Sequence, residues 1–425
     1  MDRRGSWVVM AGVVVVLCVP APASTQEGSG DTLAVPVGDA LAAAPVAWEA
    51  GAAQMVVGVW DTIIAVETDS RDLFALNAAD GKEIWRKPAF YSPEKALTHL
   101  PATDGKHVWL GLTDTLYGLR ARDGKVLFEA PLDGEIEEDL AYIGGRVVGL
   151  VSKIEGEKGT RERQFYVRDF DGATGRIKNS INVGKTTQAM FAVDREALVC
   201  YTLLRKVDAS PTDRFALTSY QLPAGAKLSS GSTGDVNGCP YAAVSRLAVA
   251  GPDGISVYLK DSLAKPLNRF GRDLPRQAAD VTISGKKAIF IQGDRVSAAD
   301  VNTPSVFWQF AVDGMSPGEI PFLSPSLFTT VGLRLVFPAA HGGSPLLVAF
   351  DSANGKNVRA SRGIDGITST TYFKNLLVAA TGKKVMAINL DKLAVLPKKD
   401  APKEPEKASK DAADGAAPAK KEPAK

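Results

Sequence analysis

The stretch LFALNAADGKEIW, from Leu73 to Trp85, decides the fold of this chain. Its apolar residues alternate, as expected for a β-strand with two distinct faces. A short polar turn containing a glycine follows, and a tryptophan closes the phrase four residues after that glycine. The stretch therefore predicts a strand, a tight turn and a second strand that carries a large ring.

Related stretches recur along the chain at a spacing of roughly 43 residues, the length of one four-stranded propeller blade. A further apolar run precedes each copy, so every unit can supply its own inner strands. We therefore predict an all-β fold, an eight-bladed β-propeller of four-stranded antiparallel blades, with seven blades as the alternative if one eroded unit is an insertion. The clearest copies are LYGLRARDGKVLF (Leu116–Phe128), YVRDFDGATGRIKN (Tyr166–Asn179), VSAADVNTPSVFW (Val296–Trp308) and LVAFDSANGKNVR (Leu347–Arg359), and weaker copies begin at Ala216, Ser256 and Val385.

The recognisable residues of the repeat have a structural explanation. An Asn or Asp at the start of the turn accepts hydrogen bonds from backbone amides further along. The glycine adopts a positive φ that other residues resist. The aromatic residue is expected on the outermost strand, where it fills the wedge between neighbouring blades. We assign these structural roles to Asn77, Gly81, Trp85, Gly124, Phe128, Asp171, Gly175, Asp300, Trp308, Asp351 and Gly355.

The two ends of the chain differ from the repeats. Arg3 and Arg4, the apolar run 8–19 and the small residues 21–23 predict a signal peptide over residues 1–23. Residues 24–50 are predicted to be a linker, residues 51–397 the propeller, and residues 398–425 a disordered tail rich in Lys, Glu, Ala and Pro. We therefore expect an exported protein, periplasmic or secreted, with outer-membrane association as a further option. Cys18 follows Leu17, a poor context for lipidation, and no transmembrane segment is expected after cleavage.

Composition and charge exclude some classes of function. The 425 residues are 45% hydrophobic and 23% charged, with a formal net charge of only +2. No clustered basic face is evident in the predicted propeller, so we expect no nucleic-acid partner. Cys200 and Cys239 remain after signal cleavage; they could form a disulfide in an oxidising compartment or stay as two buried thiols.

The repeat resembles that of pyrroloquinoline-quinone-type propellers, the tryptophan-docking repeat. LFALNAADGKEIW matches its Leu-Tyr-Ala-Leu-Asp…Thr-Gly-Lys…Trp pattern almost position by position, and LYGLRARDGKVLF matches well. One branch of this family comprises quinoprotein dehydrogenases, which carry a vicinal disulfide, a calcium ion and a catalytic Asp. The other branch is short, exported and non-catalytic, and is similar to the propeller subunit of the outer-membrane β-barrel assembly machinery. The chain has no adjacent Cys pair, and its length is closer to the second branch.

A search for other chemistry identifies no catalytic constellation, and we expect no cofactor or metal site. His99, His107 and His341 are not at metal-ligand spacing. The acidic run DGEIEEDL, residues 133–140, is predicted to lie at a propeller face or rim, as a solvated loop or as a site for a cation or basic partner. The polar loops 153–164 and 206–214 are candidate recognition surfaces.

The resulting expectation is an exported, non-catalytic and monomeric propeller. It would act as a protein-binding scaffold in the cell envelope, through its faces and inter-strand loops. The alternative is a small quinoprotein-like oxidoreductase, or another propeller enzyme, with its site in the central funnel.

Overall fold

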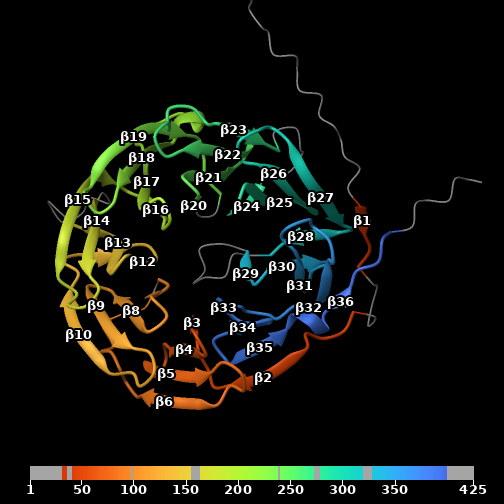
Figure 1. Cartoon of the computed structure of the whole chain (residues 1–425), viewed down its shortest axis with the longest axis horizontal. Helices are drawn as coiled ribbons and strands as arrows, with labels where there is room; N and C mark the ends of the chain where they lie inside the picture. Colours follow the sequence, from red (N-terminus) through yellow and green to blue (C-terminus); the bar gives the residue numbers. More distant parts are fainter. Residues whose placement is uncertain are drawn as a thin grey trace, which may run out of the picture.

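Eight antiparallel sheets stand around a central axis in the computed structural model of the chain (Figure 1). The structure describes residues 31–35, 41–95, 97, 99–154, 163–237, 240–271, 278–318 and 328–399. Within these ranges the only helical elements are two short 3₁₀ turns, η2 (Pro211–Asp213) and η3 (Leu390–Lys392). The eight-bladed propeller predicted from the sequence is confirmed, and the seven-bladed alternative is wrong.

The first four blades follow the chain from the axis outward. Blade 1 contains β3 (Met55–Val59), β4 (Thr62–Glu67), β5 (Asp72–Asn77) and β6 (Glu83–Lys87); blade 2 contains β7 (Ala102–Thr103), β8 (His107–Leu112), β9 (Thr115–Arg120) and β10 (Val126–Pro131); blade 3 contains β11 (Glu135–Ile136), β12 (Ala141–Ile143), β13 (Arg146–Lys153), β14 (Arg163–Asp171) and β15 (Ile177–Thr186); blade 4 contains β16 (Ala189–Asp194), β17 (Val199–Arg205), β18 (Phe215–Gln221) and β19 (Ala226–Thr233).

The last four blades follow the same order, with additions from the chain ends. Blade 5 contains β20 (Tyr241–Ala243), β21 (Arg246–Gly251), β22 (Gly254–Leu259) and β23 (Asn268–Phe270); blade 6 contains β24 (Ala278–Ser284), β25 (Lys287–Gln292), β26 (Arg295–Asp300), β27 (Val306–Val312) and β1 (Asp31–Leu33); blade 7 contains β28 (Met315–Pro317), β29 (Thr329–Val331), β30 (Arg334–His341), β31 (Ser344–Asp351), β32 (Arg359–Arg362) and β36 (Ala394–Val395); blade 8 contains β33 (Ser369–Phe373), β34 (Leu376–Ala380), β35 (Val385–Asn389) and β2 (Val46–Ala50).

Alternation along the middle strands creates the cores between blades. In β5, Leu73 and Ala75 pack against blade 2, whereas Phe74 and Leu76 pack against blade 8. All four side chains are at most 2% exposed. A middle strand is therefore apolar on both faces because each face meets a neighbouring blade, and its two-residue period sorts side chains between two cores.

Closure of the ring uses a strand from the other end of the sequence. β2 pairs with β35 and becomes the outermost strand of blade 8, next to blade 1. The stretch 24–50, predicted to be a linker, thus contains β1 and β2. A repeat search misses such strands because an isolated outer strand carries no turn signature. Because β2 precedes blade 1 in the sequence and pairs with the last strand of blade 8, backbone hydrogen bonds link the two ends of the propeller.

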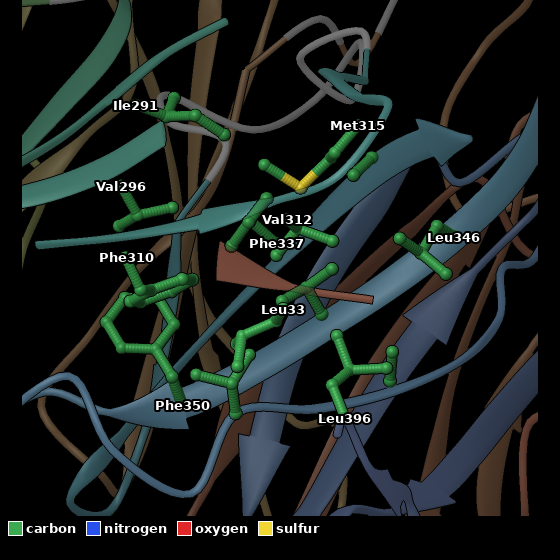
Figure 2. Packing of buried hydrophobic residues seen from close by; sticks show 14 of the residues in the cluster. Leu33, Ile291, Val296, Phe310, Val312, Met315, Phe337, Leu346, Phe350 and Leu396 are labelled. Carbon is green, nitrogen blue, oxygen red and sulfur yellow. The ribbon is translucent and has the colours of Figure 1, made fainter. Parts of the chain in front are cut away.

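Both chain ends also meet on the outside of blades 6 and 7. β1 pairs with β27 in parallel, and β36 pairs with β32. Ala34 N donates to Pro397 O at 2.9 Å, and Lys398 Nζ lies 2.8 Å from Asp31 Oδ1. Figure 2 shows Leu33 among Val312, Phe337, Phe350 and Leu396, in the core between these blades. The first residues of the predicted tail therefore bond to β1, and most of the tail lies outside the described residues.

One contact recurs between successive blades: the outermost strand places a ring on the turn of the next blade. Trp85 on β6 donates its indole N–H to Ala121 O in blade 2 at 2.8 Å. Trp48 on β2 donates to Ala78 O in blade 1 at 3.1 Å. Trp48 is thus the docking tryptophan of blade 8, although it lies near the start of the chain. The ring and the hydrogen bond together set the angle between two blades.

Blade 2 divides this contact between two residues. Phe128 on β10 lies over the turn of blade 3, at Gly175, but it has no donor. Trp109 on β8 supplies the missing N–H, which donates to Gly172 O at 2.8 Å. The Trp109 ring is 2% exposed and stacks on Tyr142 with 4.8 Å between ring centroids.

The turn glycines are required by the docked rings as well as by their backbone. Gly81 has a φ of 72°, and a methyl group there would lie 2.5 Å from Cε3 of Trp48. Gly355 has a φ of 66°, and a methyl group there would lie 2.5 Å from Cε3 of Trp308. Backbone conformation and ring packing therefore both select glycine.

Replacing Gly81 with Ala should destabilise the propeller more than the same change at Gly144. Gly144 also has a positive φ, 54°, but nothing lies within 4 Å of the position that a methyl group would take. Gly144→Ala should cost about 1 kcal/mol from backbone strain alone. Gly81→Ala adds a steric cost of about 1–3 kcal/mol as Trp48 is displaced. Equal melting temperatures for the two variants would contradict the docking role, with differential scanning fluorimetry as the measurement.

Candidate functional site

The central funnel contains a cavity with a volume of about 480 Å³. Its walls are the innermost strands β12, β16 and β20 of blades 3, 4 and 5, together with Leu100 and Pro101 before β7. Figure 1 shows these inner strands closest to the axis. Two carboxylic acids, Glu138 and Asp139, line the cavity from the segment that precedes β12.

The acidic run 133–140 divides into two parts in the structure. Asp133 lies 2.6 Å from Lys153 and 2.8 Å from Arg168, and Glu135 lies 3.2 Å from Arg163. The last two acids of the run, Glu138 and Asp139, line the funnel instead. The first acids of the run thus form ion pairs with residues of blade 3, and the last two line the funnel.

The environment of the two funnel acids favours their neutral forms. Burial, reinforced by the charges of Asp139 and Glu137, raises the pKa of Glu138 to about 8. Burial also raises the pKa of Asp139 to about 6, although the amide of Leu100 donates to its Oδ1 at 2.7 Å. Near neutral pH Glu138 is therefore mostly protonated and can donate a hydrogen bond, whereas Asp139 is mostly ionised.

The other charged residues of the cavity have different roles. Asp194 is 1% exposed and accepts hydrogen bonds from the amides of Glu196 and Ala197, so it organises the turn after β16. Arg195 and Glu196 are exposed at the mouth. Within the described ranges no group of three or more His, Cys, Asp or Glu side chains could hold a metal ion. Among the residues that the structure describes, Glu138 and Asp139 thus line the funnel without a preorganised metal site beside them.

The repeat residues singled out in the sequence lie at the turns and outer strands, away from the funnel. Asn77 Oδ1 accepts from the amide of Ala79, and Asp300 Oδ1 accepts from the amide of Asn302. Asp171 Oδ1 accepts from both the amide and the hydroxyl of Thr174. Gly124 has a φ of 65° beside Trp85, and Asp351 Oδ2 accepts from the side chain of Asn357 at 2.6 Å.

The cysteines and histidines do not form a common site in the described structure. Cys200 is a fully buried thiol in β17, and burial raises its pKa to about 12. Cys239 lies outside the described residues, so its pairing with Cys200 remains a prediction. His107 Nδ1 lies 2.9 Å from Asp104 Oδ2 in the turn before β8. Burial lowers the pKa of His99, which precedes blade 2.

Sequence reasoning missed two groups of residues. Trp48 and Trp109 complete docking contacts but lie outside the repeated phrase. Glu138 and Asp139 are indistinguishable from the surface acids beside them in the sequence. The available signal was their position just before a short inner strand, which places them near the axis.

Glu138→Gln should raise the stability of the propeller at pH 8 and leave it nearly unchanged near pH 4.5. The folded-state pKa of about 8 lies above the ordinary value of 4.5, so the folded state binds more protons than the unfolded state between these values. Wild-type stability therefore falls as the pH rises through this window, and the glutamine variant escapes that loss.

The measurement is the melting temperature of both proteins from pH 4.5 to 8.5. Glu196→Gln, an exposed change at the mouth of the same cavity, is the matched control and should run parallel to the wild type. A Glu138→Gln curve that also runs parallel to the wild type would contradict the buried, protonated state of Glu138.

Comparison with known proteins agrees with this architecture. A family profile described as outer membrane protein assembly factor BamB matches residues 71–204. No curated protein matches the whole sequence significantly. Among the described residues, no helix has the length and hydropathy of a membrane span.

Several solved structures share the fold at low sequence identity. BamB from Moraxella catarrhalis has a TM-score of 0.54 and 16% identity, over 81% of this chain and 97% of that one. The computationally designed protein Ika8 has a TM-score of 0.57 and 14% identity, over 85% and 100%. The quinohemoprotein alcohol dehydrogenase ADHIIG from Pseudomonas putida HK5 has a TM-score of 0.53 and 12% identity, over 89% and 82%. The chain is therefore a β-propeller whose residues 71–204 match the BamB profile and whose fold is similar to that of BamB.

Proposed function

We propose that this chain is an exported, non-catalytic propeller that serves as a protein-binding scaffold in the cell envelope. It is proposed to be periplasmic or secreted, with association to the outer membrane, and to act as a monomer without a bound cofactor. The observation that carries this proposal is a set of exposed apolar side chains on one face of the ring.

These side chains lie in the turns that join the two innermost strands of a blade. All blades run in the same direction around the axis, so the turns emerge on one face. Trp60 in blade 1 is 74% exposed and Leu333 in blade 7 is 81% exposed, and smaller exposed surfaces belong to Leu198 and Val244 in blades 4 and 5. We call these four residues the apolar turn face.

Backbone strain accompanies this exposure. The φ angles are 56° at Trp60, 53° at Leu198 and 52° at Val244. Large or β-branched residues rarely adopt such angles, and an exposed apolar side chain adds little to the stability of an isolated chain. A binding partner that covers these side chains provides a physical reason for both features.

The similarity to BamB supports the same proposal. BamB is an outer membrane protein assembly factor by its description, and it has a ring of similar size. The signal sequence predicted over residues 1–23 would bring this chain to the envelope. The short loops and docked blades provide a rigid frame, on which recognition can be placed at turns.

Removing apolar surface from this face should abolish capture of the partner. A Trp60→Ser, Leu333→Ser double variant should lose, at least tenfold, the envelope protein that co-purifies with the tagged full-length chain, because such anchors dominate binding. The measurement is quantitative mass spectrometry of the purified material.

Val306→Ser is the matched control for this experiment. Val306 is 53% exposed and lies on β27, an outer strand of blade 6, away from the turns between inner strands. Its removal should leave capture unchanged. Equal capture by the double variant and the wild type would contradict the assignment of the apolar turn face, and no captured protein at all would contradict the scaffold.

The funnel favours one alternative, a small quinoprotein-like oxidoreductase or another propeller enzyme. Its volume of about 480 Å³ is within the range of small-molecule sites, and it is lined by a protonated Glu138 beside Asp139. Incubation with pyrroloquinoline quinone and Ca²⁺, followed by gel filtration and absorbance spectroscopy, tests this reading. A chromophore that stays with the wild type but not with a Glu138→Gln, Asp139→Asn variant would favour the enzyme over the scaffold.

A further inference from the structure

The interface between blades 3 and 4 lacks the docked ring that blades 1, 2, 6 and 8 place on the turn of the next blade. The docking position lies four residues after the turn glycine, which gives Trp85 after Gly81 and Phe128 after Gly124. In blade 3 the same count from Gly175 reaches Asn179. Asn179 Nδ2 donates to Pro223 O in blade 4 at 2.6 Å, so it makes a polar contact with the next turn but supplies no ring.

A cavity of about 140 Å³ opens at this interface, on the axis side of the outer strand β15. Its apolar wall comes from Ile143, Val148, Leu198 and Leu222, with Pro223 at the blade 4 turn. Leu222 and Pro223 begin the turn of blade 4, directly after Gln221 at the end of β18. The equivalent residues of blade 2 are Ala121 and Arg122, and the Ala121 carbonyl accepts the indole N–H of Trp85. The cavity therefore borders the part of the interface that blades 1 and 2 fill with a ring.

The polar side of the cavity is also specific to blade 3. Asp169 on β14 is paired with Asn179 on β15. The equivalent residues on the third strand of blades 1 and 2 are small: Ala75 lies opposite Trp85, and Gly118 lies opposite Phe128. A carboxyl group therefore replaces the small residue beneath the ring. Asp169 lies in the wall of the cavity together with Arg146.

One oxygen of this carboxyl group is left without a hydrogen bond. Asp169 is 2% exposed, and its Oδ2 accepts from the guanidinium of Arg146. Its Oδ1 is buried and has no partner within the part of the chain that the structure describes. A buried acceptor of this kind is expected to receive a hydrogen bond from something that enters the cavity.

We propose that this cavity receives the indole ring of a tryptophan presented by a protein partner, with the indole N–H donating to Asp169 Oδ1. The proposal rests on the scaffold function above and gives that scaffold a specific recognition site. A cavity of this size accommodates one aromatic ring. The propeller itself uses indole N–H donors at other interfaces, from Trp48, Trp85 and Trp109.

Two further features fit a ring that arrives from outside. Leu198 belongs to the apolar turn face and also lines the cavity, so the two surfaces are continuous. The Arg146 side chain is 38% exposed, which leaves one face of its guanidinium able to stack on an entering aromatic ring. A partner that covers the apolar turn face would therefore reach the cavity without a change in the propeller.

The proposal is tested with N-acetyl-tryptophan amide as the probe and the full chain as the receptor. Saturation-transfer NMR and a titration should detect binding to the wild type. N-acetyl-phenylalanine amide, which has a ring but no ring donor, should bind about tenfold more weakly, the effect of losing one hydrogen bond to a buried acceptor.

Asn179→Trp should close the site from within the chain. The new ring takes the docking position of blade 3, so probe binding should be lost while the melting temperature stays equal or rises. Ser180→Trp is the matched control: it adds a tryptophan at the next, exposed residue of the same strand and should leave binding intact.

Three results would overturn the proposal. If the wild type does not bind the probe, the cavity at Asp169 holds only water. The Trp60 and Leu333 variants then decide the scaffold proposal separately. Probe binding that survives in Asn179→Trp takes place elsewhere on the molecule. Probe binding that is lost in Asn179→Trp while partner capture is unchanged means that the cavity takes free indole compounds and not a tryptophan of the partner.

Discussion

The packing of an outer-strand ring on the glycine turn of the next blade is the contact that fixes blades 1, 2, 6 and 8 to the blades that follow them. A propeller blade has no core of its own, because both faces of its middle strands are covered by neighbouring blades. The angle between successive blades must therefore be fixed by something at their edges. The indole of Trp85, seated over Gly124 and hydrogen-bonded to Ala121, provides such a fixed edge.

Because the contact repeats, its variations are informative. Blade 2 separates ring and donor between Phe128 and Trp109, and blade 8 obtains its ring from Trp48 near the N-terminus. Both solutions keep the interface filled. Blade 3 replaces the ring by Asn179 and leaves a cavity with a buried carboxyl group, which is a departure of another kind. Loss of packing costs stability, so a cavity with a polar group in its wall is more readily understood as a recognition site than as a packing solution.

The funnel and the apolar turn face differ in their physical character. The funnel holds a proton on Glu138 because burial and the charges of Asp139 and Glu137 disfavour its ionisation. The turn face holds Trp60 and Leu333 in water, where they gain little from the fold. The first feature resembles a small-molecule site and the second a protein interface, and the two lie on the same rigid ring. Blades that are locked at their edges can support either function without large movement.

The sequence by itself determined the fold class and the number of blades. LFALNAADGKEIW contains the alternation of a strand, the residues of a tight turn and a docking ring within thirteen residues. Interactions between residues close in sequence therefore sufficed to predict each unit of the repeat. It also assigned Asp171 and Gly175 to a turn, and the turn is present in the structure.

Only the tertiary structure decided which distant residues meet. The pairing of β2 with β35 joins residues more than 300 positions apart, and no local pattern encodes such a partner. The position of Glu138 and Asp139 in the funnel, and of Asp169 opposite Asn179, depends on closure of the ring and on strand register. Ring closure is a property of all eight blades together, and it determines which side chains become buried and which cavities remain.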